Sequence, residues 1–101
     1  MSDFTIKPDA DLPKKLLNYD VIEAIRLPDG FAQLPHWHVV ILHNTDKPED
    51  RAYSTHDVAY QKGWNGQDGP WVLNDGRYDM PHGKAIHILL ERAKKYMPVN
   101  V

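Results

Sequence analysis

A chain of 101 residues, with 42% hydrophobic and 26% charged side chains, has the composition of one globular domain and is not typical of a disordered segment. The formal net charge of −2 gives no basic excess, so the sequence predicts no general nucleic-acid binding. Cysteine is absent, which excludes disulfides, thiolate zinc sites and a cysteine nucleophile.

The first eleven residues predict a cytoplasmic location. They carry neither the basic nor the apolar segment of a secretory signal. The longest apolar run, residues 39–42, is far too short to span a bilayer, so we expect no membrane contact. Phe4 and Ile6 alternate with polar residues, and this alternation predicts a short edge strand.

Residues 12–18 are predicted to form a short helix, because Asp11 is an N-cap residue type and Pro13 suits the first helical turn. Residues 19–27 are predicted to form a strand, because Pro28-Asp29-Gly30 is typical of a tight turn between two strands. The alternative is one helix that runs through both segments.

The second strand of this hairpin is predicted to lie at the centre of the sheet. The run at residues 37–42 is rich in β-branched and aromatic side chains, and it has apolar residues on both faces of a strand. Pro35 cannot donate to a central ladder, so it predicts a bulge or an edge just before this run.

A polar loop at residues 44–50 precedes a segment with two interpretations. Ser54 resembles an N-cap with an acid three residues later, and Gly63 suits the position after a helix end, so we predict a short helix between them. The alternative is a strand over residues 51–60. A second tight hairpin is then predicted, with its turn at Asn74-Asp75-Gly76.

The segment from His82 to residue 97 contains the clearest helical pattern. Its apolar stripe consists of Ile86, Leu89, Leu90, Ala93 and Met97. Its solvated face consists of Lys84, Glu91, Arg92, Lys94 and Lys95. Asp79 and Pro81 suit the start of a helix, and Pro98 suits its end.

These elements predict one α+β domain over residues 1–101. We expect a small antiparallel sheet of three to five strands built from hairpins. The C-terminal amphipathic helix is expected to pack on one face of that sheet.

The motif His36-Trp37-His38 is a candidate metal site. Alternate residues of a strand point to one face, so both imidazoles would project together and could bind zinc. A third ligand is required, and no spacing in the sequence identifies it. The alternative is a pair of polar residues on a half-exposed strand.

The loop around residues 63–71 is the candidate partner-binding site. It contains Trp64, Asn65 and Trp71, and Arg77 and Tyr78 are predicted to face it across the second hairpin. Aromatic and arginine side chains dominate the energy of protein interfaces. The alternative is that both tryptophans belong to the core, where indoles are large apolar fillers.

No complete catalytic set is present. Ser54, His56 and Asp57 have suitable side chains, but neighbouring residues diverge, so capping is the expected role of Ser54. We therefore predict a non-catalytic domain that binds a protein partner or associates with itself.

Two alternative functions remain open. One is a metal-dependent protein, such as a small hydrolase, that uses His36 and His38 with zinc. The other is a nucleic-acid-associated regulator that acts through Arg92, Lys94 and Lys95. No cofactor other than that zinc is predicted.

Overall fold

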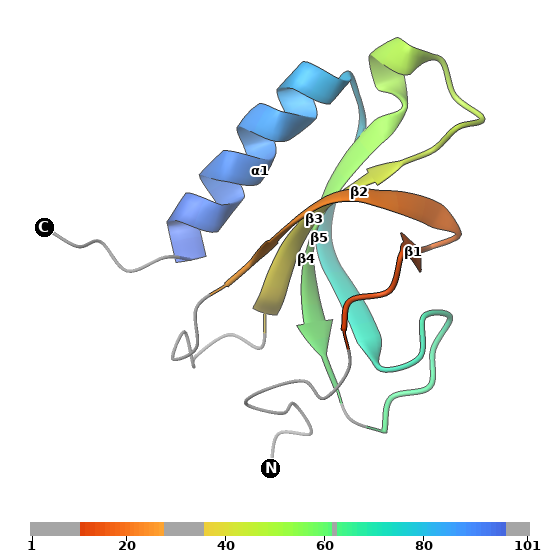
Figure 1. Cartoon of the computed structure of the whole chain (residues 1–101), viewed down its shortest axis with the longest axis vertical. Coiled ribbons are helices and arrows are strands. Elements are labelled where there is room, and N and C mark those ends of the chain that lie inside the picture. Colours follow the sequence, from red (N-terminus) through yellow and green to blue (C-terminus); the bar gives the residue numbers. More distant parts are fainter. Residues whose placement is uncertain (1–10, 28–35, 62, 97–101) are drawn as a thin grey trace, which may run out of the picture.

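A curled antiparallel sheet and a C-terminal helix make up the computed structural model, which describes residues 11–27, 36–61 and 63–96 (Figure 1). The sheet has the order β1-β2-β3-β4-β5, so each strand pairs with its neighbours in sequence. The elements are β1 (Lys15–Leu16), β2 (Tyr19–Arg26), β3 (His36–His43), the 3-10 helix η1 (Glu49–Arg51), β4 (Tyr53–Tyr60), β5 (Trp71–Met80) and α1 (His82–Tyr96). The predicted α+β class is confirmed.

A tight hairpin stands where a helix was predicted at residues 12–18, and that prediction is wrong. Leu16 pairs with Tyr19, and the two residues between them, Leu17 and Asn18, have φ angles of 53° and 65°. Two successive positive φ angles are typical of the type I′ turn that joins antiparallel strands. Leu16 is fully buried in the sheet, so tertiary packing outweighs the weak signal of a cap and a proline.

The strand predicted at residues 19–27 is confirmed as β2, and its antiparallel pairing with β3 confirms the first hairpin. Several neighbouring predictions lie outside the described residues. They are the turn at residues 28–30, the irregularity at Pro35, and the edge strand at Phe4 and Ile6.

β3 lies at the centre of the sheet, as its apolar pattern predicts, with β2 on one side and β4 on the other. Val39 and Ile41 belong to an apolar cluster that also contains Leu89 of α1. Val40 and Leu42 belong to a second cluster, which also contains Leu16, Val58 and Trp71. Both faces of β3 are therefore withdrawn from water.

β4 occupies the segment where a short helix was predicted, so the helix is wrong and the alternative strand is confirmed. Every residue from Tyr53 to Ala59 is buried. The capping pattern at Ser54 is local, whereas a strand at this position pairs with both β3 and β5. The resulting ladders and burial outweigh one cap, which contributes about 1 kcal/mol.

β5 continues through the residues that were predicted to turn, so the second hairpin is wrong as placed. Asn74 pairs with Asp57 and Arg77 pairs with Thr55, which leaves two residues of β5 opposite one residue of β4. The turn-forming residues therefore form a β-bulge, and Asp75 takes a positive φ of 52° there. The reversal between β4 and β5 lies earlier, at residues 61–70.

α1 confirms the predicted C-terminal helix, but its buried face differs from the predicted apolar stripe. Leu89 and Ala93 are buried as expected, whereas Leu90 is 56% exposed. Arg92, which was assigned to the solvated face, is only 7% exposed. Asp79 does not cap the helix; it has a φ of 60° and its carboxylate accepts a hydrogen bond from Lys47. Met97 and Pro98 lie outside the described residues.

Candidate binding site

The loop between β4 and β5 projects from the sheet at the end opposite to the start of α1 (Figure 1). Its backbone is closed by internal hydrogen bonds. Gln61 N donates to Pro70 O at 2.8 Å, Trp64 N to Gln61 O at 3.0 Å and Gly69 N to Gly66 O at 3.2 Å. Positive φ angles at Gly63 and Gly69, of 87° and 66°, allow these tight bends because glycine has no Cβ.

Asp68 connects this loop to the turn between β1 and β2. Both of its carboxylate oxygens lie 3.2 Å from the backbone nitrogen of Leu17, which donates to them. The two segments are 51 residues apart in sequence. Hydrogen bonds within the chain thus hold the loop at both its base and its side.

Trp64 is exposed at this loop and Trp71 is not. Trp64 is 49% exposed, and Asn65 beside it is also exposed. Trp71 is 6% exposed and packs in the second apolar cluster, with its ring 5.0 Å from that of Tyr60. The sequence left open whether each tryptophan belongs to the core; in the structure Trp71 does and Trp64 does not.

Arg77 and Tyr78 lie away from the tryptophan loop, because the hairpin that was predicted to bring them back does not form. Arg77 lies six positions after Trp71 in β5, which corresponds to about 20 Å along a strand. Both side chains are exposed. Of the predicted partner-binding residues, the structure brings together Trp64 and Asn65, and it places Arg77 and Tyr78 on a separate surface.

The two histidines of the candidate metal site are separated by a register shift. His36 pairs with Ala59 and His38 pairs with Val58, so a bulge lies between them. The His38 side chain is buried, and its ring centroid lies 5.9 Å from that of Trp71. Burial, together with the positive charge of the Arg26 guanidinium, lowers the pKa of His38 from 6.5 to about 4. The described residues contain no group of three His, Asp or Glu that could hold a metal ion.

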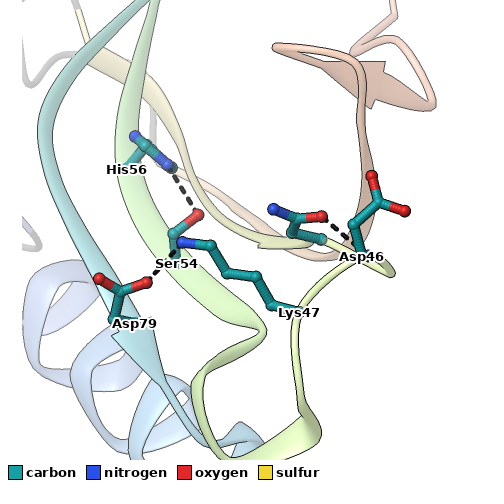
Figure 2. A network of polar contacts seen from close by, with 6 residues as sticks. Asp46, Lys47, Ser54, His56 and Asp79 are labelled. Atoms are coloured by element: carbon teal, nitrogen blue, oxygen red, sulfur yellow. Dashed lines mark hydrogen bonds and ion pairs between the residues drawn. The ribbon is translucent and has the colours of Figure 1, made fainter.

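A buried hydrogen bond joins the side chains of Ser54 and His56 in β4. His56 Nε2 lies 3.0 Å from Ser54 Oγ, because alternate residues of a strand share a face (Figure 2). Burial is the main cause that lowers the pKa of His56 from 6.5 to about 4; the Arg92 guanidinium also lowers it, and the Asp57 carboxylate partly opposes both effects. Strand periodicity could have found this pair, but the helix prediction concealed it.

The environment of this pair favours a structural role. General-base catalysis is most effective when the pKa of the base lies near the working pH. The pKa of His56, at about 4, lies well below neutral pH. Ser54 borders a hollow of only about 30 Å³, beside the ion pair between Lys47 and Asp79 (Figure 2). The hydrogen bond satisfies two polar groups that would otherwise be buried without a partner.

The arginine of the basic face predicted for α1, Arg92, is buried. Arg92 Nη1 lies 2.9 Å from the buried carboxylate of Asp57 and 3.4 Å from that of Asp75. Its other terminal nitrogen donates to the Asp75 carbonyl oxygen. Arg92 therefore anchors the helix to β4 and β5, and the nucleic-acid hypothesis loses one of its three cations.

Comparison of the chain with protein-family models, with curated proteins and with solved structures finds no match. None of the helices in the described part of the chain is long and apolar enough to cross a membrane.

Proposed function

We propose that this chain is a non-catalytic, cytoplasmic interaction domain that binds a protein partner, or a second copy of itself, through the loop at residues 61–70. The observation that supports this proposal is the position of Trp64. Its indole is half exposed on a loop that three backbone hydrogen bonds and the Asp68 carboxylate hold in place. A rigid loop loses little conformational entropy on binding, which favours affinity.

The test compares two exposed apolar residues on different elements. Trp64→Ala removes the indole, and Leu90→Ala removes a side chain of α1 that is exposed to a similar degree. Proteins retained by the immobilised variants are quantified by mass spectrometry, and self-association is measured by sedimentation equilibrium. We expect Trp64→Ala to weaken one specific interaction about 30-fold, equivalent to about 2 kcal/mol, and Leu90→Ala to have no effect. Equal behaviour of the two variants in both assays would refute the proposal.

Neither alternative function gains a specific observation in its favour. The side chain of His36 lies outside the described positions, and that of His38 faces Trp71 in the core. On α1, Arg92 is paired with Asp57 and Asp75.

A further inference from the structure

The described residues of the loop that carries Trp64 expose amides and an indole rather than charges. Among its described residues, 61 and 63–70, Asp68 is the charged one, and its carboxylate is directed to the Leu17 N–H. The exposed side chains next to Trp64 are those of Asn65 and Gln67. Each of these amides offers two donor hydrogens and one acceptor oxygen.

The indole of Trp64 lies close to Gly66. A Cβ atom at Gly66 would lie 2.5 Å from Trp64 Nε1, which is closer than Cβ atoms approach in proteins, and 3.2 Å from Cε2, which is a tight contact. The ring therefore rests directly on the backbone of Gly66, and a side chain at this position would displace it. The backbone at Gly66 itself has no positive φ, so alanine would meet the ring and no backbone strain.

The chemistry of the partner is inferred on the basis of the proposed function. We propose that the Trp64 loop recognises an uncharged, extended peptide segment: the indole covers an apolar side chain, and the amides of Asn65 and Gln67 pair with peptide main-chain groups. Main-chain N–H and C=O groups match the donors and acceptors of those amides. A charged partner residue would lose its hydration against this surface without gaining a counter-charge from the loop's described side chains.

Selection from a phage-displayed library of random twelve-residue peptides tests this inference without a known partner. The wild-type protein is the bait, and affinities of the selected peptides are measured by fluorescence polarisation. We expect sequences without Asp, Glu, Lys or Arg at the contact positions. Their Kd should change less than about twofold between about 50 mM and 500 mM salt, because screening acts on charge pairs.

Matched variants locate the binding surface. Trp64→Ala and Gly66→Ala should each raise the Kd at least about tenfold, since the first removes the indole and the second displaces it. Gly83→Ala is the control for the glycine substitution, because its Cβ would meet nothing within 4 Å. Lys62→Gln tests the one loop residue outside the described set and should leave the Kd unchanged.

The experiments distinguish failure of the uncharged-peptide proposal from failure of the interaction-domain proposal. Charged, salt-sensitive peptides that still need Trp64, or a tenfold loss of affinity in Lys62→Gln, would overturn the uncharged partner and leave the interaction domain standing. Peptides that bind wild type and Trp64→Ala equally would overturn both. If no peptide is enriched, the peptide class is overturned; a shift of indole fluorescence with cellotriose or maltotriose would then identify a sugar as the ligand.

Discussion

Acid should destabilise this domain through two buried histidines, His38 and His56. Burial holds the pKa of each at about 4 in the folded chain, against an ordinary value of 6.5. In the unfolded chain both imidazoles return to the ordinary value, so the unfolded state binds more protons between pH 6.5 and pH 4. Their neutral forms therefore contribute stability that is fully present above pH 6.5 and is lost as the pH falls towards 4.

The magnitude follows from the difference between the two pKa values. A difference of about 2.5 corresponds to about 3 kcal/mol per histidine below both values, and to about 2 kcal/mol at pH 5. The two residues are 7% and 1% exposed, so solvent screens these energies little. Together they remove about 4 kcal/mol at pH 5, a large part of the roughly 5–15 kcal/mol that stabilises a typical domain.

Urea unfolding between pH 7 and pH 4.5, followed by circular dichroism, measures this loss. The free energy of unfolding of the wild type should fall by about 4 kcal/mol from pH 7 to pH 5. His38→Gln and His56→Gln should each remove about half of that slope, because glutamine does not titrate. A constant free energy between pH 7 and pH 5, or unchanged slopes in both buried-site variants, would refute the reasoning.

Substitutions at four further positions test the packing by urea unfolding at pH 7. Asp57→Asn leaves the Arg92 guanidinium buried without its closest carboxylate and should cost about 3 kcal/mol; a loss below about 1 kcal/mol would show that Asp75 compensates. Leu89→Ala should cost about 3 kcal/mol and Leu90→Ala less than about 0.5, and equal losses would mean that the buried face of α1 is misassigned. Asn18→Ala should cost about 1 kcal/mol, because alanine disfavours the φ of 65° in the type I′ turn, whereas Asn18→Gly should be neutral; similar effects of the two would contradict that geometry.

Local sequence signals failed where long-range pairing opposed them. The cap-like residues at Asp11 and Ser54 each predicted a helix, yet both segments became strands. A cap is worth about 1 kcal/mol, whereas β4 pairs with a strand on each side and is buried along most of its length, and Leu16 of β1 is fully buried. The turn signal at residues 74–76 failed in the same way, because a β-bulge can absorb the same residues that form a hairpin turn.

The candidate site was only partly predictable for a related reason. Composition and spacing singled out Trp64 and Asn65 as a possible contact surface, and the structure exposes both. The sequence could not distinguish Trp64 from Trp71, since an indole suits both a core and an interface. Only the register of β5 against β4 shows that Trp71 opposes Tyr60 and faces the core.

The sequence by itself determined the C-terminal helix, the central strand β3 and the α+β class. The helix has a long apolar stripe on one side, and β3 is apolar on both faces. These patterns can be interpreted without knowing which distant residues a segment contacts, because the spacing of apolar residues alone indicates which face of the segment is buried. The tertiary structure alone decided the identity of β4, the position of the last reversal and the burial of Arg92. Those outcomes depend on partners far apart in sequence, such as Asp57 for Arg92, and a local pattern carries no information about them.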